Sequence, residues 1–236
     1  MKKEILTTVS CIILMILINY KGTFAEETKK YDFTDFTGVS VGWGMNLKIE
    51  QSDTYSIEVK TSSENLKYLK VEKYGRILKF YIDKHSWHKR GNIYVSITMP
   101  ELTELNLSGG SDGKIKMDVS GKPFSADLSG GSEIHGNLKC ADIDLELSGG
   151  SEVTLNGKGD DLKMEGSGGS EFKMKDFSVA NVDADLSGGS EVAITMHGKL
   201  NVDASGGSEV TFYGKAEYGR SSLSGGSEIR QGDWNN

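Results

Sequence analysis

The tetrapeptide Ser-Gly-Gly-Ser occurs seven times in the second half of this 236-residue chain, and its spacing limits what the chain can fold into. The copies begin at Ser108, Ser129, Ser148, Ser167, Ser187, Ser205 and Ser224, so that successive copies are 18 to 21 residues apart. A period of this length is typical of repeat architectures in which similar units stack on one another. A helical repeat is excluded, because every glycine in a helix interior would cost about 1 kcal/mol.

The residues around each copy alternate between apolar and polar. In the segment 144–155, "DLELSGGSEVTL", the leucines and the valine fall on one side, and the two glutamates and the threonine fall on the other. Period-two alternation next to glycines indicates short strands with one buried face. One period cannot bury its apolar face alone, whereas stacked periods share a common core. We therefore predict an all-β fold: a right-handed, single-stranded parallel β-helix (β-solenoid) of about seven coils of 18–21 residues.

The paired glycines are predicted to form a sharp corner in each coil, because glycine adopts positive φ without steric cost. These structural turn residues are Gly109, Gly110, Gly130, Gly131, Gly149, Gly150, Gly168, Gly169, Gly188, Gly189, Gly206, Gly207, Gly225 and Gly226. Both flanking serines are expected to line this corner as ladders and to form hydrogen bonds within the turn, since Ser side chains bond readily to nearby backbone groups.

Acidic residues recur at fixed offsets on both sides of the corner. The first predicted ladder contains Asp112, Glu133, Glu152, Glu171, Glu191, Glu209 and Glu228. The second contains Asp127, Glu146, Glu165, Asp185 and Asp203. In-register stacking separates equivalent carboxylates by about 4.8 Å, at which two charges in water repel by roughly 1 kcal/mol. Three interpretations remain open: a solvated face, a weak Ca2+ site, or an array that binds sugar hydroxyls.

The residues before the repeats have a different pattern. We predict a β-rich N-terminal cap and a first degenerate coil over residues 26–105, the repeat solenoid over 106–231, and a tail over 232–236. The segment 39–51, "VSVGWGMNLKIEQ", resembles one degenerate coil with Gly-Trp-Gly at its corner. A short helical turn is expected within 63–75.

Two further features of the cap concern its aromatic and basic residues. The segments 76–83 and 92–100 are predicted to form a hairpin around the loop "KHSWHKRG". The two histidines and the tryptophan of this loop suggest a hairpin tip in solvent, with a metal or glycan contact as the alternative. Trp43 is interpreted as packing on the cap, or as an exposed residue that stacks on sugar.

The first 25 residues indicate export. Lys2 and Lys3 precede the apolar run "CIILMILI", and Thr23 and Ala25 suit a signal-peptidase site. Removal of this segment would leave Cys140 as the single cysteine, which we interpret as a buried thiol rather than a nucleophile. The mature chain is then predicted to have no membrane span.

Charge is unevenly distributed along the chain. Residues 26–105 contain 12 acidic and 12 basic side chains, whereas residues 106–231 contain 20 acidic and 12 basic ones. An acidic repeat region argues against nucleic acid as a partner and leaves cations and neutral polymers open.

The order of several motifs resembles a known family. A Gly-Met-Asn turn at 44–46 precedes "IEQSDTYSIEVKTSSENLKYLKVE", "ITMPELTELNLSGGS" and the tandem glycine-serine coils. This combination, which covers nearly all of residues 32–231, is similar to the auto-transporter adhesin head family called the GIN domain. The resemblance implies a right-handed parallel β-helix in an exported protein, with adhesion as the suggested role. It implies no catalytic residue and no cofactor-binding residue.

Three functions follow as hypotheses. The first is a non-enzymatic adhesion or binding module for a glycan, a cell-envelope polymer or a protein partner, located in the periplasm, at the cell surface or outside the cell. The second is a structural spacer of the envelope. The third is an enzyme of the polysaccharide-lyase type, for which only Lys158, Asp160, Asp161 and Lys163 are available. A solvated turn explains these four residues better, so we predict no enzymatic activity.

Overall fold

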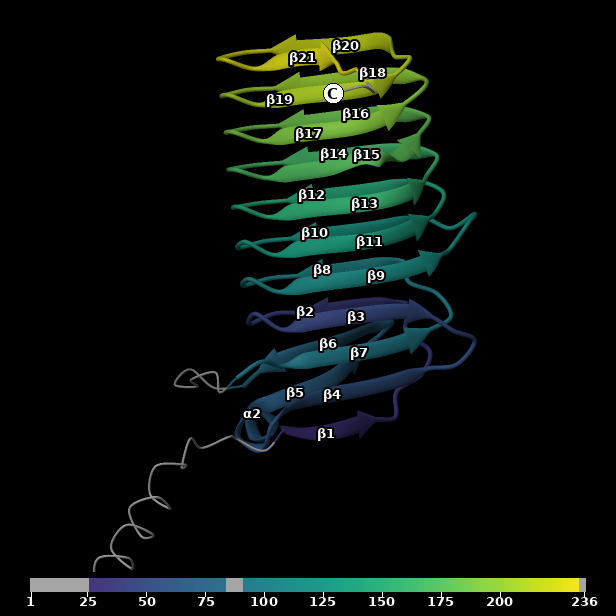
Figure 1. Cartoon of the computed structure of the whole chain (residues 1–236), viewed down its shortest axis with the longest axis vertical. Helices are drawn as coiled ribbons and strands as arrows, with labels where there is room; N and C mark the ends of the chain where they lie inside the picture. Colours follow the sequence, from purple (N-terminus) through teal and green to yellow (C-terminus); the bar gives the residue numbers. More distant parts are fainter. Residues whose placement is uncertain (1–25, 84–90, 234–236) are drawn as a thin grey trace, which may run out of the picture.

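The structure is a computed structural model that describes residues 26–83 and 91–233. Two long β-sheets run the length of the molecule, and one short helix lies at its N-terminal end (Figure 1). This helix, α2 (Ser63–Tyr68), follows the N-cap Ser62, whose side chain accepts a hydrogen bond from the Asn65 amide. No helix in the described ranges is long and apolar enough to cross a membrane. The predicted signal segment and the histidines of "KHSWHKRG" lie outside the described residues.

Each sheet is a continuous ladder of strands. The first sheet consists, in spatial order, of β1 (Glu26–Tyr31), β4 (Ser56–Ser62), β7 (Tyr94–Met99), β3 (Asn46–Gln51), β9 (Asp112–Asp118), β11 (Glu133–Lys139), β13 (Glu152–Lys158), β15 (Glu171–Val179), β17 (Glu191–Met196), β19 (Glu209–Gly214) and β21 (Glu228–Gln231). The second sheet consists of β20 (Glu217–Leu223), β18 (Lys199–Ala204), β16 (Asn181–Leu186), β14 (Asp161–Gly166), β12 (Ile143–Leu147), β10 (Phe124–Leu128), β8 (Glu104–Leu107), β2 (Gly38–Val41), β6 (Ile77–Ile82) and β5 (Leu69–Tyr74).

Each Ser-Gly-Gly-Ser coil contributes one strand to each sheet. The even-numbered strand lies in the second sheet, the chain turns at the corner, and the odd-numbered strand lies in the first sheet. From β8 to β21, every strand pairs in parallel with its equivalents in the neighbouring coils. The predicted all-β β-solenoid with a β-rich N-terminal cap is confirmed, and the cap contains antiparallel strand pairs.

The core between the two sheets is formed by the inward residues of every strand. One in-register column contains Leu107, Leu128, Leu147, Leu186 and Ala204, all of which are buried. Burying a leucine side chain completely contributes roughly 1.5–3 kcal/mol, so stacking supplies the stability that a single coil lacks.

The corner is held by backbone stacking and by one buried serine. Gly188 has a φ of 76°, and a Cβ at this position would lie 2.7 Å from the carbonyl oxygen of Gly168 in the neighbouring coil. Gly189 does not have positive φ, and its amide donates to the same oxygen at 2.7 Å. Ser190 is buried and its hydroxyl donates to the Ser187 carbonyl. The second serine of the corner therefore points inward, and its hydroxyl makes a hydrogen bond within the turn.

The predicted degenerate coil exists, but the chain order of the first layers is not sequential. The coil β2–β3 lies between β6–β7 on one side and β8–β9 on the other (Figure 1). Trp43 and Gly44 both have a φ of 63° and form its corner. A Cβ at Gly109 would lie 3.3 Å from the Trp43 nitrogen, so this corner stacks on the next one.

The hairpin predicted for residues 76–83 and 92–100 is wrong. β6 pairs in parallel with β2 in the second sheet, whereas β7 pairs in parallel with β3 in the first. These two strands form one more coil, with β6 in the second sheet and β7 in the first. This arrangement buries the apolar faces of both strands against the solenoid core, which a hairpin on the surface would leave exposed.

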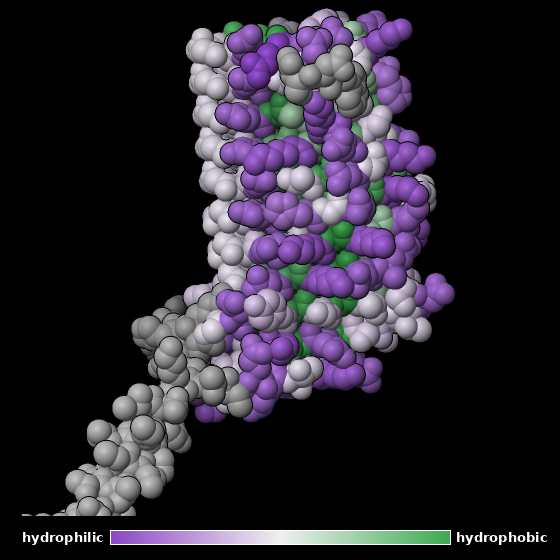
Figure 2. All heavy atoms as spheres, viewed as in Figure 1, coloured by the Kyte–Doolittle hydropathy of each residue, from purple (hydrophilic) through white to green (hydrophobic). Residues whose placement is uncertain are grey.

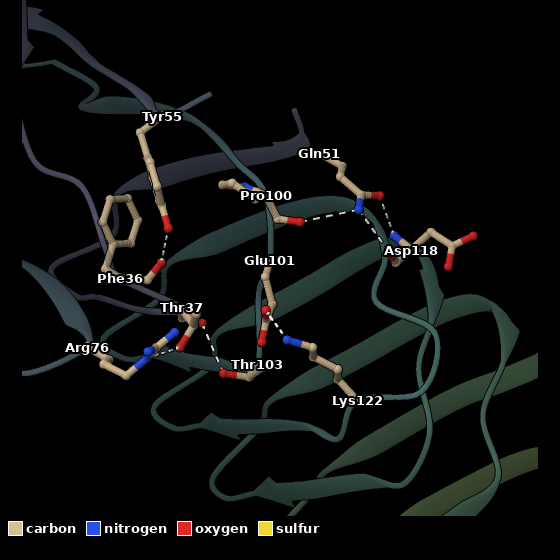
Figure 3. Close-up of polar contacts among 10 residues, drawn as sticks. All are labelled: Phe36, Thr37, Gln51, Tyr55, Arg76, Pro100, Glu101, Thr103, Asp118 and Lys122. Carbon is tan, nitrogen blue, oxygen red and sulfur yellow. Dashed lines mark hydrogen bonds and ion pairs between the residues drawn. The ribbon is translucent and has the colours of Figure 1, made fainter. Parts of the chain in front are cut away.

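Polar contacts fasten this N-terminal region to the repeats (Figure 3). The Gln51 side chain joins two levels, because it donates to the Asp118 carbonyl at 2.8 Å and accepts from the Asp118 amide at 2.9 Å. Lys122 of the repeats pairs with Glu101 of the N-terminal region. Within that region, Tyr55 donates to the Phe36 carbonyl and Arg76 donates to the Thr37 hydroxyl. The cap and the solenoid thus share hydrogen bonds as well as a core.

Candidate binding surface

The first acidic ladder lies at the beginning of the strands of the first sheet. Register pairs Asp112 with Glu133, and each later member with the next as far as Glu228. Basic side chains two residues further along the strands neutralise part of it. Lys173 lies 2.6 Å from both Glu152 and Glu171. Arg230 pairs with Glu209 in the coil before it.

These ion pairs shift the pKa values of their members. Burial opposes ionisation of Glu152, but the hydrogen bonds from Lys173 and Thr154 outweigh it and hold the pKa of this carboxyl below its ordinary value. Hydrogen bonds to Glu152 and Glu171 raise the pKa of Lys173 to about 12. The first sheet therefore neutralises part of its acidic ladder with its own cations.

The second acidic ladder lies at the end of the strands of the second sheet, just before the corner. Register aligns Asp127, Glu146, Glu165, Asp185 and Asp203. Among the described residues, only Glu165 forms a salt bridge, with Lys163. The first four members of the ladder, together with Ser148, Ser167 and Ser187, border a shallow depression of about 260 Å³.

The two sheets also differ in the charge that their strands carry over the whole repeat region. Within the seven Ser-Gly-Gly-Ser coils, the strands of the first sheet carry 9 acidic and 7 basic side chains, and those of the second carry 10 and 3. In Figure 2, hydrophilic side chains cover most of the visible face, and the corner forms a pale ridge along its left edge. The second sheet is therefore the acidic face of the molecule.

A groove of about 750 Å³ runs along this acidic face. It crosses five consecutive strands, from β10 to β18, and so extends for about 19 Å parallel to the solenoid axis. One wall is an in-register column of Ser125, Asp144, Lys163, Asp183 and Asn201. The other wall contains Asp142, Asp161, Asn181 and Lys199, and Pro123 lies at one end.

The polar groups of the groove are partly ordered by one another. Asn181 donates to Asp161 at 2.7 Å and accepts from the Lys199 amide at 2.8 Å. One carboxylate oxygen of Asp144 is shielded from solvent and accepts no hydrogen bond from the described residues. Hydrogen bonding to Glu165, and the nearby charge of Asp144, raise the pKa of Lys163. The groove thus offers both hydrogen-bond donors and hydrogen-bond acceptors.

Sequence reasoning did not single out this groove. Its signal is visible in retrospect as the column two residues before the second ladder, from Ser125 to Asn201. That column mixes hydroxyl, carboxylate, amine and amide, so it does not stand out as a repeat. The second wall is the column two residues earlier in the chain, so Asp142 and Asn181 lie beside the first wall on the same outer face.

The remaining candidate residues lie apart from the groove or take ordinary structural positions. Among the described residues, no three His, Cys, Asp or Glu side chains converge on a position that could hold a metal ion. Cys140 is buried, and burial raises the pKa of its thiol to about 12. Trp43 is half exposed at its corner. Lys158 and Asp160 are exposed near the second turn of their coil.

The fold and its surfaces define a class: a two-sheet β-solenoid with an N-terminal cap and long polar faces. The family model described as "Putative auto-transporter adhesin, head GIN domain" matches residues 35–216. The chain therefore belongs to this adhesin-head family, as its motif order predicts. A search of curated proteins gives no significant match.

Solved structures share the fold. A "putative adhesin" from Bacteroides fragilis superposes with a TM-score of 0.79 at 16% identity, covering 88% of this chain and 97% of that one. A "putative adhesin" from Parabacteroides merdae gives 0.73 at 16% identity, with coverages of 90% and 98%. A "Putative lipid binding protein" from Parabacteroides distasonis gives 0.70 at 18% identity, also with coverages of 90% and 98%.

Proposed function

We propose that this chain is an exported, non-enzymatic adhesion module that binds a polysaccharide along the groove of the second sheet. The observation that carries the proposal is the groove itself, which repeats hydrogen-bonding side chains over five coils. Each coil presents its groups at the same spacing, so a polymer that follows the axis would make many similar weak contacts. Such contacts add up to useful avidity without any single strong site.

The chemistry of the groove favours a polyhydroxyl ligand. Carboxylates accept hydrogen bonds, lysine donates them, and amides and hydroxyls do both, which matches the mixed capacity of sugar hydroxyls. Alternate side chains of β10, β12, β14 and β16 point into the core, so the backbone of these strands forms the floor of the groove. Pro123 adds an apolar surface that the C–H groups of a sugar ring can contact.

Charge narrows the class of polysaccharide. Four aspartates face the groove together with two lysines, within a sheet that is acidic over its whole length. Uronic-acid or sulfated polymers would be repelled by this face, whereas neutral or amino-bearing polymers would not. We therefore propose a neutral or amino-bearing glycan of the cell envelope or of a contacted surface. Export is supported by the predicted leader and by the adhesin family.

A glycan array with the full mature chain tests the proposal. We expect capture of neutral or amino-bearing glycans and weak capture of acidic ones. Asp144→Asn with Asp183→Asn should lower the affinity for a captured glycan at least tenfold, since hydrogen bonds to charged groups contribute roughly 1.5–3 kcal/mol each and those to the neutral amides contribute less. The recovered glycan should keep its length, whereas shortened products would contradict the non-enzymatic part.

Glu191→Gln is the matched control. Glu191 belongs to the same coil as Asp183, and its substitution also removes one negative charge isosterically, but it lies in the first sheet. It should leave binding unchanged. Equal losses in the control and the groove variant would point to bulk charge and would contradict the groove. If the folded chain captures no glycan, the adhesion proposal is contradicted and the structural-spacer hypothesis is favoured.

A further inference from the structure

The last coil, β20–β21, leaves core positions open to solvent. Leu223 is 44% exposed, whereas Ala204, its in-register neighbour, is 1% exposed. Tyr218 is 57% exposed, although the residue that it stacks on, Leu200, is 1% exposed. Ile229 continues a column of buried residues and is only partly covered. The apolar column that every lower coil buries is thus uncovered at this end.

The backbone at this end is uncovered too. β20 and β21 are the outermost strands of their sheets, so within the described residues each presents an edge of amides and carbonyls that pair with no further strand. In the other corners the second serine donates to the carbonyl three residues before it, as Ser208 does to Ser205. The equivalent Ser227 hydroxyl is shielded and has no partner among the described residues. An exposed sheet edge of this kind is a template for pairing with another strand.

The opposite end is protected in a different way. Its edge strands β1 and β5 pair antiparallel to their neighbours, and both carry several charged side chains. Charged edges discourage strand addition. Stacking of one molecule's last coil on another molecule's cap is therefore disfavoured, and so is growth into a filament.

We propose that the last coil is the interface with a second copy of this chain, joined end to end through a twofold axis. A partner that covers both edges at once must present two strands at the spacing of this solenoid. The last coil of a second copy presents two strands at this spacing because its structure is identical. Twofold symmetry turns the partner's strands antiparallel to β20 and β21 and closes the assembly at two copies.

Charge permits this contact. The strands of the last coil carry Glu217, Arg220, Glu228 and Arg230, two of each sign, unlike the acidic coils below. If β21 pairs antiparallel with its own copy about Ile229, Glu228 of each chain stands opposite Arg230 of the other. Opposite charges in cross-strand positions stabilise such a pairing, and like charges would oppose it.

Light scattering and analytical ultracentrifugation of the mature chain, over a range of concentrations, test the proposal. We expect a reversible equilibrium between one and two copies, without larger species. Amides of β20 and β21 should gain protection from hydrogen exchange as the concentration rises, while those of β1 and β5 should not. A monomer throughout, or a series of growing oligomers, would overturn the proposal.

Tyr218→Lys and Tyr74→Lys form a matched pair. The two tyrosines are similarly exposed, at 57% and 59%, but Tyr74 lies on the cap. Tyr218→Lys should weaken dimerisation at least tenfold, and Tyr74→Lys should leave it unchanged, with thermal unfolding as the check that both fold. Leu223→Lys provides a second variant, should Tyr218→Lys not fold. Equal effects of the two tyrosine variants would refute the assignment of this surface. Asp144→Asn in the groove, which is far from the last coil, should leave dimerisation intact, so this proposal and the polysaccharide proposal can fail separately.

Discussion

The two faces of the solenoid use the same device, a ladder of stacked carboxylates, in different electrostatic surroundings. On the first sheet, Lys173 and Arg230 reach the ladder from two residues along the strand. On the second sheet, Asp127, Asp185 and Asp203 form no salt bridge among the described residues. Stacking fixes only the positions of equivalent residues. The neighbouring column decides whether a ladder is neutralised or left as a charged surface that can engage a ligand.

The corner holds both ladders in register, so its first glycine should give the largest effect. Gly188→Ala forces a side chain into positive φ and against the Gly168 carbonyl, and we expect a loss of about 2 kcal/mol or more in the free energy of unfolding. Gly189→Ala should change it by less than about 0.5 kcal/mol, because Gly189 has ordinary φ and no close neighbour at its Cβ position. Urea unfolding of both variants measures the difference. Equal losses would mean that the corner needs both glycines.

Removing one carboxylate from each ladder should give effects of opposite sign. Glu152→Gln breaks the ion pair with Lys173 and should destabilise by about 0.5 kcal/mol. Asp185→Asn relieves repulsion from Glu165 and Asp203 on either side and should stabilise by a few tenths of a kcal/mol. Urea unfolding at low and high salt compares them, and both effects should shrink as salt is added. A strong loss with Asp185→Asn would show that this ladder makes specific bonds.

The ion pairs of the first sheet should make a small contribution to the pH dependence of stability. The pKa of Glu152 is lowered on folding, so its contribution is present above its ordinary value of 4.5 and is lost as the pH falls through the lower value in the folded protein. The pKa of Lys173 is raised to about 12, so its contribution is present below 10.5 and is lost as the pH rises through about 12.

The thermal midpoint of the parent chain should therefore exceed that of Glu152→Gln with Lys173→Met near neutral pH. The difference should narrow at both extremes of pH. A difference that stays constant across the whole range would contradict ion pairing as the cause.

Calcium should have the smallest effect, even on the second ladder. Ca2+ takes six to eight oxygen ligands, and the described residues contain no group of three acidic or histidine side chains that converge on one position. We expect millimolar CaCl2 and NaCl of equal ionic strength to shift the thermal midpoint alike, by screening. A shift specific to calcium, abolished by Glu146→Gln, would establish a site on this ladder.

The coils and the alignment of the two ladders were predictable because their determinants are local. A glycine pair every 18 to 21 residues places the corners, and period-two alternation then specifies which side chains face the core. Once the coils stack in register, equivalent positions such as Glu133 and Glu152 must be neighbours. The family resemblance rests on the same repeated motifs.

The sequence by itself therefore determined the repeat, the buried face and the columns. The tertiary structure alone decided which columns lie side by side, and the reason is that these contacts are not local. β6 and β7 belong to opposite sheets because β6 pairs with β2 and β7 pairs with β3. The coil β2–β3, although earlier in the chain, lies between their coil and the first Ser-Gly-Gly-Ser coil. The groove exists because two columns, which lie two residues apart on the outer face of the second sheet, are held in register over five coils. Leu223 occupies a core position by pattern, and the absence of a described coil above it leaves it in solvent.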